Sequence, residues 1–363
     1  MTTTAEPENS AVMAQVAARH LGAQAEQVAV SKLTGDASTR AYYRAQANGA
    51  SVIISIYGTP FDETKPAAER LAEIEAVNPA ARLTFASDPC AHIETTRLFL
   101  AAGLPVPRIL GAEGSLAMIV FEDVGDMRLQ DWLSERPEIE KAAVYYRAVE
   151  LIVKIQEATK MALEADSISS RMAFDEAKLR WELGFFFANY FNRYLHMRLD
   201  PAVSNGVQVD FKALCAELAA RPRVLTHRDY HARNLMMKGD ELIIIDFQDA
   251  RMGPASYDLA SLVSDPYTAL PADVAAGLVE HFIELKSRSS LPLADLDEFR
   301  RELDLMTLQR MLKAVGTYAS QAAIGNVIYV DYIEPALERA IAAIDRLNRF
   351  EPTRDLLEKV RRA

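Results

Sequence analysis

The chain has 363 residues, of which 40 are basic and 51 acidic, so its formal net charge is −11. Half of the residues are hydrophobic and a quarter are charged, a composition that excludes collagen-like, disordered and disulfide-scaffold proteins. Because the phosphate backbone of nucleic acid attracts basic surfaces, we expect no nucleic-acid partner for this acidic chain.

The sequence also lacks the features of membrane and secreted proteins. No apolar run reaches the roughly 18 residues of a membrane span, and the first residues lack the basic and apolar regions of a secretory signal. Two cysteines, Cys90 and Cys215, are too few for a disulfide framework, which favours a reducing compartment. We therefore expect a cytoplasmic protein that acts on a small molecule, with no membrane partner and with its oligomeric state left open.

Three segments near the start of the chain have the alternating or β-branched pattern of strands. They cover about 28–33, 40–46 and 51–57. Asn48 and Gly49 separate the last two segments, and this dipeptide indicates a hairpin because a type I′ turn needs positive φ at both central positions. The pattern predicts an antiparallel meander of three strands.

One main helix and two more strands complete the predicted N-terminal lobe. Residues 59–87 resemble an insertion, which contains a helical pattern over 66–77. The main helix is expected from about Asp88 to Leu100, with Gly103 as its stop. The two remaining strands are expected at 108–110 and 116–121.

Helical patterns dominate the remainder of the chain. They cover 137–160, 174–199, 210–220, 272–287, 296–319 and 333–347. One polar loop and a short buried strand pair, over 223–234 and 241–246, interrupt them. We predict a bilobal α+β fold with an N-terminal lobe (1–121), a hinge (122–126) and a helical C-terminal lobe (127–363). Clefts between lobes commonly bind ligands.

The densest polar cluster runs from His227 to Asn234, and Asp246 follows an apolar strand twelve residues later. The spacing His-x-Asp-x-x-x-x-Asn, followed by Asp-Phe, is the signature of a kinase catalytic loop and metal loop. Phosphoryl transfer needs a carboxylate that accepts the proton of the attacking hydroxyl, and oxygen ligands for Mg²⁺. We therefore predict a catalytic loop at 227–234 and a metal loop at 246–249.

Each polar residue of these loops receives an expected role. Asp229 is the predicted base, Asn234 and Asp246 are the predicted metal ligands, and His227 braces the loop. His231 and Arg233 are candidates to face the phosphates.

Other interpretations of these residues are weaker. In one of them, Asp229 and Asp246 merely cap turns or bridge helices. The ordered spacing of Asp229, Asn234 and Asp246 around a strand argues against this interpretation. A metal pair of His227 and His231 needs a helix and a third ligand, and Cys90 with His92 is too sparse for zinc.

Further segments extend the pattern and resemble the aminoglycoside phosphotransferase and choline kinase superfamily, over roughly residues 30–320. Within it, the chain is most similar to bacterial cell-wall sugar kinases that phosphorylate N-acetylmuramate and N-acetylglucosamine at the anomeric hydroxyl. The segments that carry the resemblance are 35–38, 102–107, 122–125, 227–236, 245–250, 253–261 and 308–316.

The resemblance implies a protein-kinase-like fold that binds ATP and Mg²⁺. It implies that Asp258 braces the catalytic loop from a buried position. Other members of the family use the hinge to meet adenine and a polar loop to cover the phosphates. The matching residues here are Glu122, Asp123 and Val124 in the hinge, and Gly35, Asp36, Ala37 and Ser38 in the loop.

The chain departs from typical kinases on its third strand. That strand, 51–57, has no Lys to pair with a Glu on the following helix, where Glu94 stands. The anomeric sugar kinases tend to lack this Lys as well. The cation for the phosphates is therefore left open among Lys32, Arg40, Arg44 and Lys65.

Substrate contacts in this fold come from the helical lobe. Aromatic faces and bidentate polar groups suit a sugar, which makes Trp181, Glu182 and Arg310 candidates, although aromatics at helical spacing are usually core. The six basic residues against four acids in 345–363 favour a neutral or anionic sugar over an aminoglycoside polycation. A choline-type acceptor would need an aromatic cage, for which the aromatics at 181–194 are candidates.

We expect an ATP- and Mg²⁺-dependent kinase that phosphorylates a hydroxyl of an amino sugar. An aminoglycoside or choline/ethanolamine phosphotransferase is the alternative. A different functional class is a pseudokinase, a scaffold without catalytic activity. The missing Lys on the third strand favours this class, and the presence of Asp229, Asn234 and Asp246 opposes it.

Overall fold

The computed structural model describes residues 6–33, 40–80, 88–268 and 270–362. The chain divides into two compact units, the first made of 1–127 with 236–249 and the second of 128–235 with 250–363. The sequence placed 236–249 with the helical lobe. The segment joins the first unit because Met237 N–H donates to Met127 O (2.7 Å) and Ile244 N–H to Pro105 O (2.7 Å).

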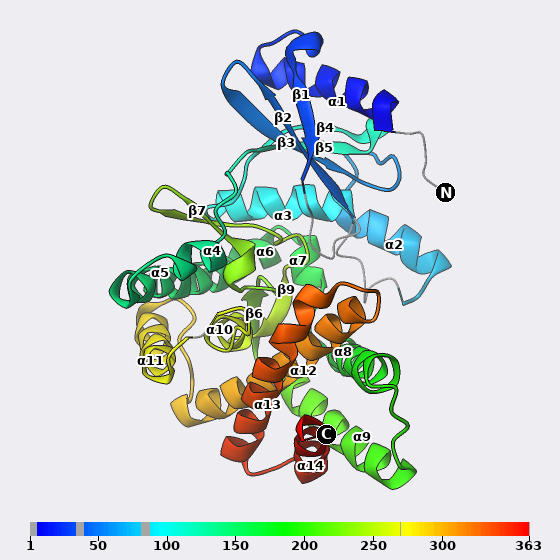
Figure 1. The fold of residues 1–363 in the computed structure, drawn as a ribbon. Coiled ribbons are helices and arrows are strands. Elements are labelled where there is room, and N and C mark those ends of the chain that lie inside the picture. The colour runs from blue at the N-terminus through cyan, green and yellow to red at the C-terminus, as the bar shows by residue number, and fades with distance from the viewer. Residues whose placement is uncertain (1–5, 34–39, 81–87, 269, 363) are drawn as a thin grey trace. The chain divides into compact units, whose positions relative to one another are not determined.

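The first unit contains a five-stranded antiparallel sheet in the order β1-β2-β3-β5-β4 (Figure 1). Its strands are β1 (Ala29–Lys32), β2 (Ala41–Ala47), β3 (Ala50–Ile56), β4 (Ile109–Glu113) and β5 (Met118–Glu122). Asn48 and Gly49 have φ of 54° and 74°, so they form the predicted hairpin turn between β2 and β3. The five strands expected from the sequence are confirmed.

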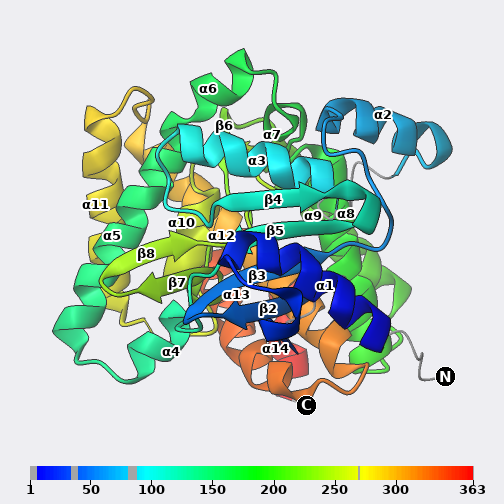
Figure 2. The same cartoon turned by 90° about the horizontal axis from the view of Figure 1, so that it is seen from above.

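Two helices pack on this sheet. α1 (Glu6–Leu21), which the sequence analysis did not predict, buries Met13 and Val16 against Ile54 and Val120. Because side chains alternate along a strand, the residue after Val120, Phe121, points to the other face. There it meets His92 of α3 (Pro89–Ala101), with ring centroids 4.8 Å apart. β4 and β5 run between α3 and α1 in Figure 2.

Local chemistry explains where the other elements of the first unit begin and end. The Asp88 carboxylate caps α3 by accepting from the N–H groups of Cys90 and Ala91, and Gly103, with φ of 69°, follows its end. α2 (Ala67–Val77) occupies the predicted insertion. β7 (Leu235–Lys238) and β8 (Glu241–Ile244) form a two-stranded sheet.

The second unit is mostly helical. Its helices are α4 (Leu129–Ser134), α5 (Glu138–Glu157), α6 (Thr159–Glu164), α7 (Ile168–Arg171), α8 (Glu176–Phe187), α9 (Pro201–Ala219), α10 (Tyr257–Val263), α11 (Ala272–Arg288), α12 (Leu296–Ala322), α13 (Ile333–Leu347) and α14 (Glu351–Arg361). Buried residues of α12, among them Leu305, Met311 and Val315, lie in a core shared with α8 and α13. β6 (Arg223–Thr226) pairs with β9 (Arg251–Pro254).

Two helix boundaries differ from the expected ones by more than one helical turn. α9 begins at Pro201 rather than at 210, because Asp200 caps it and proline suits the first helical position. One helix was expected over 174–199, but the α-helix α8 ends at Phe187. A π-helical segment, Ala188–Tyr194, follows it. α14 was not predicted.

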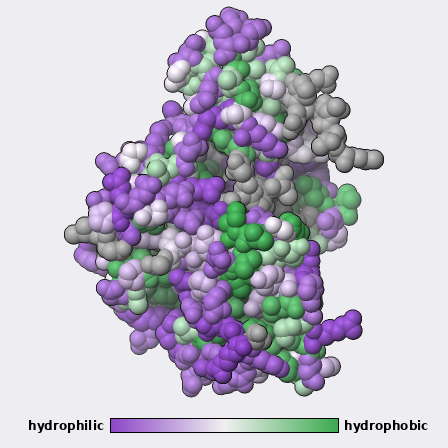
Figure 3. All heavy atoms as spheres, viewed as in Figure 1, coloured by the Kyte–Doolittle hydropathy of each residue, from purple (hydrophilic) through white to green (hydrophobic). Residues whose placement is uncertain are grey.

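The surface is largely hydrophilic on the face shown in Figure 3. Apolar surface gathers near the end of α12 and the 3₁₀ segment Val327–Tyr332, where Ile324, Val327 and Ile328 are exposed. Within the described ranges, no helix combines the length and apolar composition needed to cross a membrane.

Candidate active site

The predicted catalytic loop follows β6 in the second unit, and Asp258 holds its start. The buried Asp258 carboxylate accepts from the main-chain N–H of His227 (2.7 Å) and of Arg228 (3.0 Å). His227 Nδ1 accepts from the N–H of Asp229 (3.2 Å). Arg228 has a φ of 92°, a conformation that costs energy in a residue other than glycine and that these bonds maintain. The loop is therefore fixed from α10.

Asp229 is surrounded by cations. Its Oδ1 accepts from Lys313 Nζ (2.7 Å) and Arg310 Nη2 (3.0 Å), and Arg228 Nη1 lies 3.5 Å from Oδ2. Burial opposes ionisation, but the charges of Lys313, Arg228 and Arg310 outweigh it and hold the pKa of this carboxyl well below its usual range. Asp229 is therefore an anion at neutral pH, as a proton acceptor must be.

Arg310, a predicted substrate residue, is a direct neighbour of the predicted base. Its side chain is buried, and besides Asp229 it donates to Ser261 Oγ (2.8 Å) and Tyr257 OH (2.7 Å). This placement makes it a residue that positions the carboxylate.

The sequence analysis missed Lys313 as a site residue. The spacing of three between Arg310 and Lys313 was the available signal, because residues at i and i+3 share a helix face.

Asn234 lies close to the main chain of Asp229. Its Nδ2 donates to Asp229 O (2.9 Å), which leaves the amide oxygen as its ligating atom. The neighbouring Ala232 N–H donates to Asp265 Oδ2 (2.8 Å), so the end of the loop is held as firmly as its start. Asn234 thus presents an oxygen of the kind that Mg²⁺ prefers.

His231 and Arg233, expected near the phosphates, pack against tyrosines. The His231 ring lies 5.2 Å from that of Tyr267, and burial lowers the pKa of His231 to about 3, so the ring is neutral. The Arg233 guanidinium carbon lies 4.7 Å from the Tyr267 ring centroid and 5.3 Å from that of Tyr329. The Arg233 guanidinium therefore lies against two aromatic rings.

The other two predicted substrate residues lie on α8. Glu182 is buried, accepts from Gln309 Nε2 (2.9 Å) and faces Lys178 at 3.7 Å. Trp181 is 39% exposed, and Lys178 Nζ lies 4.5 Å from its ring centroid. Phe186 and Phe191, from the segment considered for an aromatic cage, are buried in the core instead.

The predicted metal loop belongs to the first unit. Asp246 follows β8 with a φ of 60°, and its Oδ1 accepts from Arg40 Nη2 (3.2 Å) and Gln248 Nε2 (2.9 Å). The next residue, Phe247, stacks on Phe99 of α3 with centroids 5.2 Å apart. Phe247 thus anchors the chain next to Asp246 on the helix that supports the sheet.

The four basic residues considered as the cation for the phosphates have different surroundings in the structure. Arg40 has an 8% exposed side chain and contacts Asp246. Arg44 forms ion pairs with Asp123 and Asp126, and Lys65 pairs with Glu73. The fourth, Lys32, is exposed on β1. Glu94 accepts from the N–H of Ala67 at the start of α2 (3.3 Å).

The residues expected to meet the nucleotide base and phosphates are only partly described. Glu122 accepts from Arg108 Nε (3.0 Å) and Lys238 Nζ (2.7 Å), and the Asp123 carboxylate accepts from Gly125 N–H (2.9 Å). Val124 follows Asp123 in the sequence. The polar loop Gly35, Asp36, Ala37 and Ser38 lies outside the described residues, so its role stays a prediction.

In the described part of the chain, no group of three or more His, Cys, Asp or Glu side chains is arranged to hold a metal ion. This finding concerns sites rich in such ligands, for example the His227 and His231 alternative. It does not bear on a pair of one amide and one carboxylate oxygen.

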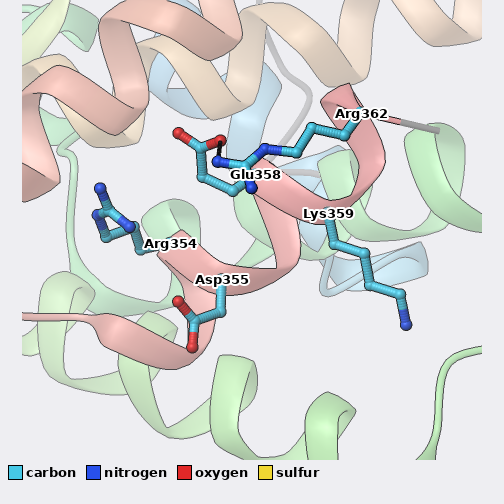
Figure 4. A pocket seen from close by; sticks show the side chains of 5 residues that line it. All are labelled: Arg354, Asp355, Glu358, Lys359 and Arg362. Atoms are coloured by element: carbon cyan, nitrogen blue, oxygen red, sulfur yellow. Dashed lines mark hydrogen bonds and ion pairs between the residues drawn. The ribbon is translucent and has the colours of Figure 1, made fainter.

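A shallow depression over α14 contains none of the predicted site residues. Arg354, Asp355, Glu358, Lys359 and Arg362 line it (Figure 4). Within this lining, Arg362 pairs with Glu358. Arg354 pairs with Asp345, which does not belong to the lining.

The basic C-terminal segment was taken to favour a neutral or anionic sugar over an aminoglycoside polycation, but its side chains do not carry this argument. Arg346, Arg349 and Arg361 pair with carboxylates of neighbouring helices, so the segment has little positive charge to offer a ligand.

Comparison with known proteins identifies the class. The chain matches the model of the phosphotransferase enzyme family over residues 29–294. A Pseudomonas aeruginosa protein named N-acetylmuramate/N-acetylglucosamine kinase is 27% identical over 287 residues, which are 79% of this chain and 75% of that protein. A Neisseria meningitidis protein of the same name is 30% identical over 216 residues, or 59% of this chain and 63% of that protein.

Among solved structures, the choline kinase of Cryptosporidium parvum aligns with a TM-score of 0.59 at 10% identity, covering 95% of this chain and 99% of that one. This likeness shows the fold and confirms the predicted α+β class. Because the family model spans well over half of the sequence, the chain belongs to the phosphotransferase enzyme family. It is therefore an enzyme of the kinase type, with a hydroxyl acceptor, and the resemblance drawn from its motifs is confirmed.

Proposed function

We propose that this enzyme uses ATP and Mg²⁺ to phosphorylate the anomeric hydroxyl of an amino sugar, N-acetylmuramate or N-acetylglucosamine. The names of the two relatives support the acceptor. The observation that carries the chemistry is the ionised Asp229, fixed in a loop whose Asn234 presents an amide oxygen. Such a loop is the part of a kinase that receives the acceptor.

In this proposal, Asp229 orients the acceptor hydroxyl and takes its proton as the oxygen attacks the γ-phosphorus of ATP. The new bond joins the sugar oxygen to phosphorus, the bond to the β-phosphate oxygen breaks, and ADP leaves. Arg310 keeps the carboxylate aligned through its contacts with Ser261 and Tyr257. The charge that spreads over the transferred group must be offset by cations.

The donor set fits Mg²⁺. The Asn234 side chain presents an amide oxygen and the Asp246 side chain carboxylate oxygens, and both are hard ligands of the type this ion prefers. When bound, the ion neutralises part of the phosphate charge.

Arg40 is the basic residue that we assign to the ATP phosphates in place of the missing Lys. It is buried, it contacts the predicted metal ligand Asp246, and the charge of Asp246 helps to keep the guanidinium ionised against the effect of burial. Arg44 and Lys65 pair instead with carboxylates that are not predicted metal ligands. ATP binding is expected to draw Arg40 towards the phosphates.

The alternative acceptors fit the second unit less well. A choline-type ammonium needs an aromatic cage, but Arg233 already lies against the rings of Tyr267 and Tyr329. An aminoglycoside is a polycation, and the predicted base is flanked by Lys313 and Arg228. Like charges would repel such a substrate. Both observations favour a neutral or anionic acceptor.

Two variants test the proposal from its two sides. Asp229→Asn keeps the size of the side chain but removes the base, so we expect kcat with either sugar to fall by roughly 10³-fold or more while the Kd of Mg-ATP changes little. Arg40→Met is expected to weaken Mg-ATP binding by at least about tenfold. Coupled-assay kinetics and calorimetric titration give the two quantities.

The alternatives predict different results. An Asp229→Asn enzyme with unchanged kcat would refute the assigned base. A wild-type chain that binds ATP but phosphorylates no sugar, choline or aminoglycoside would instead be a scaffold.

A further inference from the structure

The part of the predicted acceptor site that solvent reaches is small and carries an excess of positive charge. The side chains of Asp229, Lys313 and Arg228 are 16%, 16% and 20% exposed. Their neighbours Arg310, Lys178 and Glu182 are at most 5% exposed. An acceptor that approaches Asp229 therefore meets one carboxylate between two cations.

The buried groups behind this rim leave the excess in place. Arg251 and Arg310 oppose two further carboxylates, Glu182 and Asp258, and Lys178 lies beside Glu182. Burial and then the charge of Arg228 lower the pKa of Lys178 to about 6 and that of Arg251 to about 10. Cations that lower one another's pKa in this way form a site that an anion would stabilise.

The two cations on Asp229 Oδ1 differ in their freedom to bind a ligand. All three guanidinium nitrogens of Arg310 are engaged, by Ser261, Tyr257 and Asp229. Within the described part of the chain, the ammonium of Lys313 has a single hydrogen-bond partner, Asp229 at 2.7 Å. Because an ammonium has three N–H donors, Lys313 has two left for a group next to the reacting hydroxyl.

Resting on the function proposed above, we propose that Lys313 determines acceptor specificity by binding a carboxylate of the sugar, so that the enzyme prefers N-acetylmuramate to N-acetylglucosamine. The two sugars differ by a lactyl ether, and this group supplies the carboxylate. A ligand oxygen on Lys313 and a hydroxyl on Asp229 lie at most about 8 Å apart, three hydrogen-bond lengths in a line. The substituent and the anomeric oxygen of one sugar ring span a distance of this order.

The test is the ratio of kcat/KM for N-acetylmuramate to that for N-acetylglucosamine, measured with Mg-ATP. Lys313 also touches Asp229, so Lys313→Met lowers both values, but this shared loss cancels in the ratio. We expect the ratio to fall by at least about tenfold, since one charge-assisted hydrogen bond is lost. Lys313→Arg, which retains the charge, should recover part of the preference.

Arg310→Gln is the matched control, because it removes the other cation from the same oxygen of Asp229. It should lower activity on both sugars and leave the ratio within about twofold, a difference of less than 0.5 kcal/mol. Calorimetry without nucleotide gives a second readout: Lys313→Met should weaken the binding of N-acetylmuramate and not that of N-acetylglucosamine.

The outcomes separate the two proposals. If the wild type is active but Lys313→Met lowers both kcat/KM values by the same factor, Lys313 acts by positioning Asp229 or by binding the phosphate. The inference is then wrong. If the wild type phosphorylates neither sugar, the proposed function fails and the inference fails with it. A wild type that prefers N-acetylglucosamine would also overturn the inference.

Discussion

The side chain of Lys286 illustrates how strongly one residue can link stability to pH. It lies in the last turn of α11 and is 1% exposed, and its Nζ has no hydrogen-bond partner among the described residues. Burial lowers the pKa of Lys286 to about 8, although the charge of Glu157 opposes the shift. The folded state therefore loses this proton at a lower pH than the unfolded state does.

We predict that Lys286→Met raises the free energy of unfolding by roughly 2 kcal/mol at pH 7. Below pH 8 both states of the wild type are charged, so the folded state bears the full penalty of a buried cation. Between the folded pKa of about 8 and the ordinary lysine pKa of 10.5, the unfolded state binds more protons and wild-type stability rises with pH. The advantage of the variant should therefore shrink over this window, as urea denaturation at pH 7 and pH 10 would show.

The control for this prediction is Lys359→Met. Lys359 also lies in the last turn of its helix, α14, but it is exposed. Any favourable interaction of a last-turn cation with the helix carbonyls is thus removed in both variants. A pH-dependent gain in Lys359→Met as large as that in Lys286→Met would show that burial is not its cause.

At the same scale, the site shows which residues a local pattern reveals. The spacing of Asp229, Asn234 and Asp246 was readable because one loop and one strand end carry them. Their partners were not, since Lys313 reaches Asp229 across 84 positions of sequence. The environment of Arg233 was equally hidden, because its tyrosines come from two distant segments.

Two glycines on facing helices show how packing decides the effect of a single methyl group. A Cβ on Gly316 of α12 would lie 2.6 Å from the Phe186 Cα and 3.0 Å from its nitrogen, both of them backbone atoms of α8. A Cβ on Gly184 of α8 would have nothing within 4 Å. The close approach of α8 to α12 therefore depends on Gly316.

We predict that Gly316→Ala destabilises the protein by about 1–3 kcal/mol, because the two helices must move apart. Gly184→Ala should stabilise it by about 0.5–1 kcal/mol, because alanine has the higher helix propensity. Thermal or urea unfolding of the two variants measures both effects. Equal changes of one sign would mean that the helices do not approach as closely as described.

Elements were predictable where local chemistry fixes them. The Asn48–Gly49 turn is specific for a hairpin, and the Asp88 cap for the start of a helix. Both the hairpin and α3 appear where they were expected. The start of α9 was missed because Ser204, Asn205 and Gly206 weaken the helical pattern, although Asp200 caps the helix before them. Tertiary packing of its apolar face overrides these weak propensities.

On the scale of the whole molecule, the first unit is built from two separate parts of the chain. Residues 236–249 belong with 1–127, and Phe247 is one of their buried apolar residues. Its ring stacks on Phe99 and meets His92, both in α3, at centroid distances of 5.2 and 5.7 Å. No local pattern predicts this arrangement, because residues 128–235, which belong to the second unit, separate the two parts in the sequence.

We therefore predict that Phe247→Ala weakens the first unit selectively. Loss of a buried phenylalanine typically costs about 3–5 kcal/mol, and the opening of a cooperative unit raises amide exchange throughout that unit. In the full-length protein, hydrogen exchange of α3 and β5 should become faster, while α12 and α13 keep their protection. Phe186→Ala, which removes a buried ring from the core of the second unit, should give the opposite pattern. If either variant accelerated exchange equally in both units, the chain would be opening as one cooperative body, and the assignment of 236–249 to the first unit would have no energetic meaning.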